Sequence, residues 1–298
     1  MKYFLFLILL LSSQLSYSQT KRALIIGLGE QQDTSWGKIN GDKDVSYVKN
    51  MLVPSGFTDI TTLVNREATK DAIVKEFNSL AKRAKLDDVI YIHYSGHGQQ
   101  MTDLNKDEND RYDESWIPYD AFRKYCSNDK GNKHLCDDEI AYLLTSIRNR
   151  IGLNGKIIVV VDACHSGDSS KEMTNDINQE YNTTVIPFDE TDYVVRGVID
   201  RFIIPQGNAS LPVKRYDESW ITISACESYQ LNLELKNPQV GRLTYALYNI
   251  WKQNNALTNN QLLEALTEKM NQRKSMRIKQ SPKITGKIHV TNILQTIK

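Results

Sequence analysis

The chain has 298 residues, of which 40% are hydrophobic and 24% are charged, a composition typical of a globular protein with one large core or two small ones. Lys and Arg together number 37, against 36 for Asp and Glu. This balance creates no strong field of either sign, so it argues against nucleic acid or an anionic membrane as a partner. Any recognition of charge must therefore be local.

The N-terminus has the pattern of a secretory signal peptide. Lys2 precedes an apolar run from Tyr3 to Leu11, and serines stand at positions −3 and −1 of a cut before Gln19. A membrane-spanning helix needs roughly 20 apolar residues, about twice the length of this run. We therefore expect residues 1–18 to be removed on export, leaving a secreted or periplasmic protein with no membrane contact.

Apolar runs alternate with amphipathic helical patterns along most of the chain. Strands are predicted at about 22–28, 60–64, 88–94, 156–161, 220–225 and 283–290. Helices are predicted around residues 45–52, 73–81, 140–147, 243–251 and 259–270, with Thr69 and either Asp137 or Asp138 as N-caps. This alternation predicts a mostly parallel sheet with helices on both faces, which binds ligands beyond the carboxyl ends of its strands.

Two long polar segments, 99–136 and 169–215, lack this periodicity, and each is interpreted as a functional loop or a linker. The alternation resumes after the second segment without a fresh start, which favours one interrupted domain. The sequence Arg-Tyr-Asp-Glu-Ser-Trp-Ile occurs at both 111–117 and 215–221. It is too short for a repeat fold, so it is either coincidental or lines one cleft twice.

The cysteines outside the motifs below allow several interpretations. Cys126 and Cys136 lie in a polar stretch and, in an exported protein, either close a disulfide loop or stay free. His134 lies beside Cys136, but a zinc site would need a fourth ligand. Cys226 follows a hydrophobic strand and is typical of a core residue.

Two predicted strands end in turns with reactive side chains. One delivers His97 within Tyr-Ser-Gly-His-Gly, and the other delivers Cys164 within Asp-Ala-Cys-His-Ser-Gly. A thiol within hydrogen-bond reach of an imidazole can attack an acyl carbon, because the imidazole favours the thiolate and later protonates the leaving amine. We predict Cys164 as the nucleophile, His97 as its acid–base partner, and the N–H groups of Gly98 and Cys164 as the oxyanion hole.

Structural alternatives exist for both residues, because a cysteine after a strand is usually core and a strand-end histidine is usually just hydrogen-bonded. Two other histidines compete for the role of base. His93 lies within the strand and His165 adjoins the nucleophile, so His97, at the strand exit, is better placed.

The pairing of the motifs at 94–98 and 162–167 resembles the metacaspase branch of the caspase-like peptidases. Supporting similarity lies at 40–45, 113–118, 137–140, 223–227 and 241–247. The resemblance implies an α/β caspase-like three-layer sandwich and a peptide or protein substrate. It divides the chain into a signal peptide (1–18), a large-subunit region (19–168), a linker with a processing site (169–215) and a small-subunit region of the same domain (216–298).

The resemblance also implies cleavage after Arg or Lys. The acidic positions of the family's substrate pocket match Asp162, two residues before the nucleophile, and Asp44. A buried carboxylate pair is stabilised when a cation shares its field. The alternative role of Asp162 is a strand-end cap or turn former.

Some metacaspases bind calcium through acidic side chains that match Asp113, Asp137 and Asp138, while the chemistry itself requires no cofactor. A further acidic position of the family falls near Lys171 here, with Asp168 as the nearest carboxylate. The same resemblance marks the linker as a segment that is cut during maturation. We hypothesise self-cleavage at one or more of its basic residues, Lys171, Arg196, Arg201, Lys214 and Arg215.

Two other functions fit the same residues. One is an inactive caspase-like module used for binding. The other is a peptide ligase or transferase, in which an amine replaces water at the same acyl-enzyme.

Overall fold

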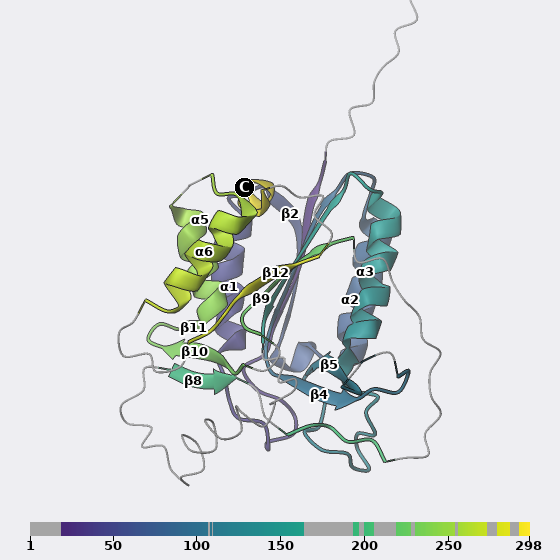
Figure 1. Ribbon diagram of the computed structural model, residues 1–298. Helices are drawn as coiled ribbons and strands as arrows, with labels where there is room; N and C mark the ends of the chain where they lie inside the picture. The colour runs from purple at the N-terminus through teal and green to yellow at the C-terminus, as the bar shows by residue number, and fades with distance from the viewer. Residues whose placement is uncertain are drawn as a thin grey trace, which may run out of the picture.

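The computed structural model describes residues 19–106, 108, 110–163, 193–196, 200–205, 219–227, 230–253, 256–272, 279–286 and 292–298. Its central sheet consists of β1 (Lys21–Gly27), β2 (Phe57–Val64), β3 (Val89–Ser95), β7 (Lys156–Asp162), β9 (Ile221–Ser224) and β12 (Lys283–Thr285). The strand order is β12-β9-β7-β3-β1-β2 (Figure 1). All neighbours are parallel except the edge strand β12, which pairs antiparallel with β9.

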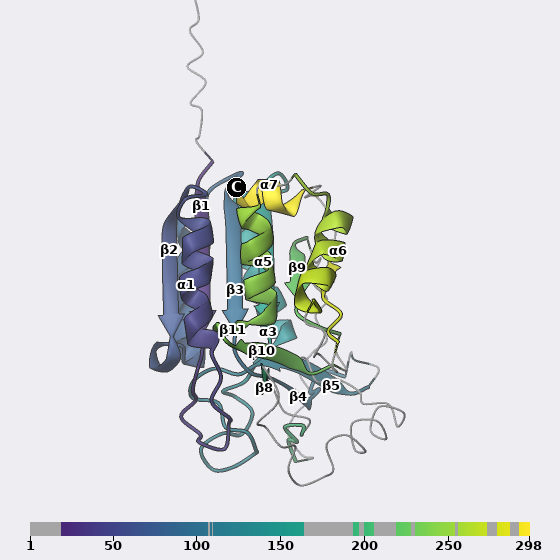
Figure 2. The ribbon, with the colours of Figure 1, turned by 90° about the vertical axis from the view of Figure 1, so that its left-hand side faces the viewer.

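Helices cover both faces of this sheet (Figures 1 and 2). One face carries α1 (Gly41–Leu52), α5 (Arg242–Lys252), α6 (Asn259–Met270) and α7 (Ile293–Ile297). The other carries α2 (Lys70–Arg83) and α3 (Asp137–Ile151). A short 3-10 helix, η1 (Asn65–Glu67), joins β2 to α2. The predicted three-layer α/β fold is therefore confirmed.

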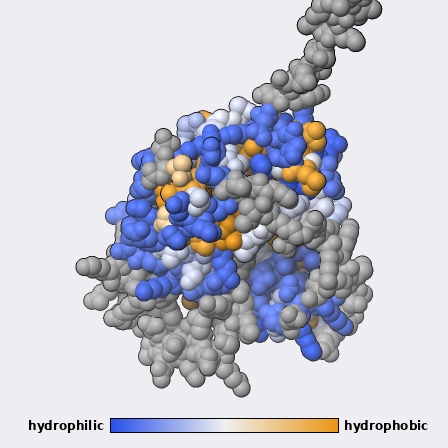
Figure 3. Space-filling view, turned by 45° about the horizontal axis from the view of Figure 1, so that its top comes forward, coloured by the Kyte–Doolittle hydropathy of each residue, from blue (hydrophilic) through white to orange (hydrophobic). Residues whose placement is uncertain are grey.

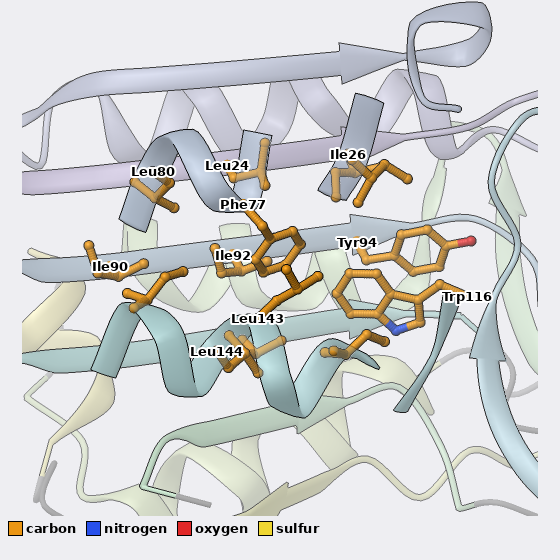
Figure 4. Close-up of a cluster of buried hydrophobic side chains, with 14 of the residues drawn as sticks. Leu24, Ile26, Phe77, Leu80, Ile90, Ile92, Tyr94, Trp116, Leu143 and Leu144 are labelled. Carbon is orange, nitrogen blue, oxygen red and sulfur yellow. The ribbon is translucent and has the colours of Figure 1, made fainter. Parts of the chain in front are cut away.

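Alternate residues of each strand supply two separate cores, because successive side chains of a strand point to opposite faces. In β1, Ala23 and Ile25 pack under α1 and α5, whereas Leu24 and Ile26 pack under α2 and α3. Figure 4 shows the second of these cores, with Phe77 of α2 lying against the sheet. Burial on both faces explains why the central strands are nearly continuous apolar runs.

One of the two predicted helix caps is confirmed and the other is wrong. Thr69 Oγ1 accepts a hydrogen bond from the N–H of Ala72 at 3.3 Å, as expected for the N-cap of α2. The N-cap of α3 is Cys136, which makes no side-chain capping bond, and Asp137 and Asp138 are the first helical residues. Asp137 instead turns its carboxylate toward Asp113, in an acidic cluster described below.

Segment 99–136, predicted to be a loop, holds most of a small antiparallel sheet. It consists of β4 (Gly98–Thr102), β5 (Tyr112–Trp116) and β6 (Leu135–Cys136). A third sheet combines β8 (Tyr193–Arg196), β10 (Asn232–Lys236) and β11 (Gln239–Gly241). All of these strands are short, and β4 and β5 are largely polar, so antiparallel pairing and local packing, rather than a hydrophobic period, determine them.

The two copies of the repeated heptapeptide share a structural role in the residues described. Trp116 and Trp220 are both buried in the core under α2 and α3. Trp116 stacks on Tyr94 with ring centroids 4.4 Å apart. Residues 215–218 of the second copy lie outside the described residues.

Part of the predicted linker packs against the large-subunit region. Residues 200–205 lie along β4, where the N–H of Phe202 donates to the carbonyl of Gln100 at 2.8 Å and the N–H of Thr102 donates to the carbonyl of Phe202 at 3.0 Å. The Phe202 side chain is fully buried. This short segment is therefore an integral part of the fold.

The end of the sheet opposite its carboxyl edge is mostly hydrophilic, with small separate hydrophobic patches (Figure 3). The exposed Leu86 and Leu153 precede β3 and β7 and thus belong to this end. No helix within the described ranges combines the length and apolar character needed to span a bilayer.

Candidate active site

The predicted catalytic residues follow two neighbouring parallel strands. Ser95 of β3 is the register partner of Asp162 of β7, and the N–H of Gly96 donates to the carbonyl of Asp162 at 3.4 Å. His97 lies two residues beyond Ser95, and Cys164 follows Asp162 at the same spacing. Cys164 itself lies outside the described residues, as does His165, so the structure describes the histidine and the strand end that leads to the thiol.

The imidazole of His97 is buried and has one nitrogen held by the backbone. Nε2 lies 2.7 Å from the carbonyl oxygen of Gly37, with 2% of the residue exposed. Because a carbonyl oxygen can only accept, Nε2 carries the hydrogen, and Nδ1 is the nitrogen that can take a proton. The backbone carbonyl of His97 accepts hydrogen bonds from the Tyr94 hydroxyl at 2.6 Å and the Ile117 N–H at 3.2 Å.

Gly98, one predicted oxyanion donor, directly follows His97 as the first residue of β4 and pairs in register with Trp116. Its predicted partner, the N–H of Cys164, lies outside the described residues. The described half of the predicted oxyanion hole is thus adjacent in the chain to the histidine.

Asp44 and Asp162, predicted to form the acidic pocket, lie together as a buried carboxylate pair. Thr244 Oγ1 lies 2.7 Å from Asp162 Oδ2 and 3.2 Å from Asp44 Oδ2. Both aspartates are fully buried. A Cβ atom at Gly241 would lie 2.7 Å from Asp44 Oδ2 and closer still to Asp162 Oδ2, so a larger residue at 241 would push the pair apart.

The N-terminus of α5 holds this carboxylate pair. The N–H of Gly241 donates to Asp44 Oδ1 and the N–H of Thr244 donates to Asp162 Oδ2, both at 2.8 Å. The Asn232 amide donates to Asp162 Oδ1 at 2.8 Å, and the Ser95 hydroxyl donates to Asp44. All of these described donors are neutral N–H or O–H groups. The site therefore combines residues of the large-subunit and small-subunit regions.

His93, the competing base, is a buried support for the carboxylate pair. Its Nε2 lies 3.3 Å from Thr244 Oγ1, and its Nδ1 lies 3.4 Å from the hydroxyl of Tyr91. Burial raises the pKa of Tyr91, which keeps the phenol neutral and able to donate. His93 thus lies under the pair rather than at the strand exit.

Four site residues had no role in the sequence interpretation: Gly37, Ser95, Asn232 and Thr244. Ser95 and Thr244 lie in the motifs at 94–98 and 241–247, but nothing in their spacing indicated a contact with a carboxylate. Gly37 and Asn232 carry no local signal.

Two of the three predicted calcium ligands lie together in an acidic cluster. Among the described residues, the potential metal ligands that gather within 4.8 Å of one another are Asp113, Cys136 and Asp137. The third predicted ligand, Asp138, accepts a hydrogen bond from the amide of Asn105. The cluster brings together the start of β5, the end of β6 and the start of α3.

The electrostatics of this cluster are unfavourable for a second negative charge. Asp137 Oδ1 is buried and has no hydrogen-bond partner among the described residues. Burial, together with the charges of Glu114, Asp138 and Glu108, raises the pKa of Asp137 to about 8. Burial likewise raises the pKa of Glu114. A hard cation would relieve this repulsion, and the Asp113 and Asp137 oxygens suit calcium, whereas the Cys136 thiol does not.

The open interpretations of the remaining cysteines are resolved where the structure describes them. Cys126 and Cys136 are free thiols, so they do not form a disulfide. His134 contacts Asp129 and Gln99, and therefore adds no zinc ligand beside Cys136. Cys226 is buried, as expected for a core residue.

The candidate self-cleavage residues differ in their surroundings. The Arg201 guanidinium lies 4.0 Å from the centre of the Tyr112 ring, and its Nε donates to Gln100 Oε1 at 2.9 Å. Arg196 belongs to β8, where it pairs in register with Asn232. The other three candidates, Lys171, Lys214 and Arg215, lie outside the described residues.

Two solved structures have folds similar to that of this chain. A protein of Geobacter sulfurreducens superposes with a TM-score of 0.62 at 22% identity, covering 90% of this chain and 93% of that one. Caspase-1 of Spodoptera frugiperda superposes with a TM-score of 0.58 at 11% identity, covering 90% and 86%. At such low identities these matches establish the fold alone: an α/β sandwich of the caspase type.

The sequence comparisons establish the family. The chain matches the caspase domain family over residues 20–291, and it therefore belongs to this family of cysteine-type peptidases. Metacaspase-1A of Aspergillus oryzae is 33% identical over 161 residues, which cover 50% of this chain and 35% of that protein. Metacaspase-1 of Coccidioides immitis is 31% identical over 157 residues, covering 50% and 32%. The match thus spans about a third of the length of each metacaspase.

The shared contact of Thr244 with both aspartates makes its hydroxyl important for stability. We expect Thr244→Val to lower the free energy of unfolding by about 1–3 kcal/mol, because it leaves buried carboxylate oxygens short of a donor. Thr244→Ser keeps the hydroxyl and should retain most of that stability. Urea unfolding of the three proteins measures the difference, and equal losses in both variants would show that the hydroxyl is not the important group.

Proposed function

We propose that this protein is an exported cysteine endopeptidase that cleaves after Arg or Lys and uses Cys164 and His97. The observation that carries the proposal is the parallel pairing of Ser95 with Asp162. This pairing sets His97 and the chain leading to Cys164 at one edge of the sheet. His97 donates its Nε2 hydrogen to the carbonyl of Gly37, so Nδ1 is the nitrogen proposed to accept the thiol proton.

The proposed reaction passes through a thioester. His97 Nδ1 takes the thiol proton, and the Cys164 sulfur attacks the carbonyl carbon of the scissile peptide. The N–H groups of Gly98 and Cys164 stabilise the oxyanion. The imidazolium then gives its proton to the leaving amine as the C–N bond breaks. Water, deprotonated by His97, attacks the thioester and releases the acid and the free thiol.

The carboxylate pair supports the proposed preference for a basic residue. Asp44 and Asp162 approach each other closely enough to share Thr244 Oγ1, and the described donors that orient them are neutral groups. A guanidinium or ammonium group would balance two carboxylates where an acidic side chain would be repelled. The pair is therefore the proposed determinant of specificity.

A fluorogenic assay with Arg, Lys and Asp substrates tests both parts of this proposal. We expect cleavage of the Arg and Lys substrates only, with Cys164→Ala inactive and His97→Gln reduced by about 10²–10⁴-fold. Asp162→Asn should lower kcat/KM for the basic substrates by more than about tenfold, because a charge-assisted contact is lost. Cys226→Ala is the matched control, since this core cysteine should leave activity unchanged.

Each outcome of that assay bears on one part of the proposal. Preferred cleavage of the Asp substrate would overturn the role of the carboxylate pair, and full activity of Cys164→Ala would overturn the nucleophile. Absence of turnover in the wild type would favour the binding module. Products that carry an added amine acceptor, detected by mass, would indicate a ligase or transferase.

We further propose that the acidic cluster binds calcium. Asp113 and Asp137 would provide carboxylate oxygens, with Asp138 beside them, and the buried oxygen of Asp137 would gain a partner. A bound cation would stabilise the start of α3 against β5 and neutralise like charges. The proposed role is structural, because the cluster is built from residues other than those of the reaction.

Thermal unfolding with calcium, magnesium or EGTA tests this site. We expect calcium to raise the Tm of the wild type by several degrees, because a ligand at about 100 times its Kd adds about 2.7 kcal/mol. Asp137→Asn should abolish this shift and raise the Tm in EGTA, because one buried carboxylate is removed. Asp71→Asn, an exposed control at the start of α2, should leave the calcium shift intact. A wild-type Tm that is the same in calcium and EGTA would contradict the proposal.

Self-processing in the linker is also proposed. Peptide cleavage needs an extended, accessible segment, whereas Arg201 is held by side-chain contacts and Arg196 is paired in a strand. These contacts argue against cleavage at Arg196 and Arg201 in the folded protein, so we propose Lys171, Lys214 and Arg215 as the sites. Cleavage at Arg196 or Arg201 alone would contradict this choice.

Intact-mass analysis of protein recovered from the producing culture tests processing and export together. The wild type should be cut after Lys171, Lys214 or Arg215, whereas Cys164→Ala should remain one chain, because the active thiol makes the cut. Both should begin at Gln19 if residues 1–18 are removed on export. Identical fragments in both proteins would rule out self-cleavage, and a chain that retains residues 1–18 would contradict export.

A further inference from the structure

Trp36 lies directly against the imidazole of His97. The two ring centroids are 5.0 Å apart, with the planes inclined by 30°. Trp36 is almost fully buried, and its Nε1–H donates to the carbonyl of Ala121 at 3.1 Å. The next residue, Gly37, supplies the carbonyl that binds His97 Nε2. One short stretch of chain therefore contacts the imidazole through both an aromatic ring and a backbone acceptor.

The indole ring belongs to a small cluster of its own. Trp36, Ile117 and Ala121 pack together, apart from the two large cores on the faces of the sheet. A large aromatic residue in such a small cluster adds little to the main cores. Its principal described contacts are with the histidine and with the chain that follows β5.

Hydrogen bonds and an ion pair among Asp33, Arg123 and Asp200, called the brace below, stabilise the turn that carries Trp36. Asp33 accepts hydrogen bonds from the N–H groups of Ser35 and Arg123, both at 2.9 Å. The Arg123 guanidinium donates to the carbonyl of Ser35 at 3.2 Å and forms a bidentate pair with Asp200 at 2.9 and 2.6 Å. The Gln99 amide donates to the carbonyl of Asp200 at 2.8 Å. Asp200 lies in the predicted linker, so this brace connects the linker to the turn beside His97.

We propose that Trp36 is a positioning residue that holds the His97 imidazole and favours its protonated form, and that the Arg123–Asp200 pair keeps the Trp36 turn in place. The inference rests on the proposed roles of His97 and Cys164. An aromatic face attracts a cation, and the Gly37 carbonyl accepts the Nε2 hydrogen, so both contacts stabilise an imidazolium beside a thiolate.

Tyr94 is a titratable residue that contacts His97 in the part of the chain that the structure describes. Tyr94, from β3, donates its hydroxyl to the His97 carbonyl, and the segment before α1 presents the neutral Trp36 and Gly37. Cys164 is the proposed titrating partner. A change at Trp36 should therefore be visible in the ionisation of the catalytic pair.

The test compares Trp36→Ala and Trp36→Phe with the wild type over a range of pH, with active sites counted by an irreversible thiol reagent. For Trp36→Ala we expect kcat per active site to fall by about tenfold or more, with little change in KM, because orientation is lost. The alkaline limb of kcat/KM should move to lower pH by about half to one unit, because the imidazolium loses its aromatic neighbour. Trp36→Phe should restore most of both.

Trp251→Ala is the control for general loss of stability, because this residue lies in α5 and donates to Ser55, far from the histidine. It should lower the Tm without moving the alkaline limb. If Trp36→Ala likewise lowers only the Tm or the active fraction, the positioning role is overturned. If Trp36→Ala does not fold, Trp36→His takes its place. The positioning role is then overturned if Trp36→His has the same kcat and the same alkaline limb as the wild type.

A double-mutant cycle tests the brace. Arg123→Gln and Asp200→Asn should each lower kcat by about two- to fivefold, the size expected for a partly exposed ion pair, and the double variant should lose no more than either single one. Unchanged kcat or fully additive losses would overturn the link to the linker. Activity in Cys164→Ala would instead overturn the proposed function, so the two failures are distinguishable.

Discussion

The parallel pairing of β3 with β7 is the constraint on which the rest of the site depends. Because Ser95 lies opposite Asp162, β3 and β7 end at the same edge of the sheet. A proposed catalytic residue follows two positions after each of these strand ends. A slip of one residue would turn every side chain of a strand to the other face and exchange the two cores. The strands are buried on both sides, so packing in both cores maintains the register that the site requires.

The buried carboxylate pair connects the stability of the fold to its proposed function. Two ionised groups in an interior are costly unless hydrogen bonds compensate for lost water. Here the N-terminus of α5 and the hydroxyl of Thr244 provide that compensation, and they join the small-subunit region to α1 and β7. The contacts that hold the two regions together thus also preserve the negative charge proposed to select the substrate.

Local sequence patterns predicted most of the central fold but not the smaller sheets. The strands of the parallel sheet are apolar runs because both faces are covered, and Thr69 marks the start of α2 by a local capping bond. β4 and β5 carry polar residues whose pairing depends on partners distant in the chain. The cap predicted at Asp137 or Asp138 was wrong because Asp137 lies against Asp113 of β5. A contact with a distant strand cannot be predicted from the periodicity of a helix.

The sequence by itself was enough to predict the fold class and to identify His97, Asp162 and Cys164 as candidate site residues at the ends of two strands. Strand periodicity and turn motifs are local properties of the chain, so they can be recognised without a structure. Only the tertiary structure decided what surrounds them. Gly37 lies 60 residues before His97, and Thr244 lies 200 residues after Asp44. Such contacts follow from the packing of whole helices and strands. A short stretch of sequence therefore does not predict which distant group a side chain contacts.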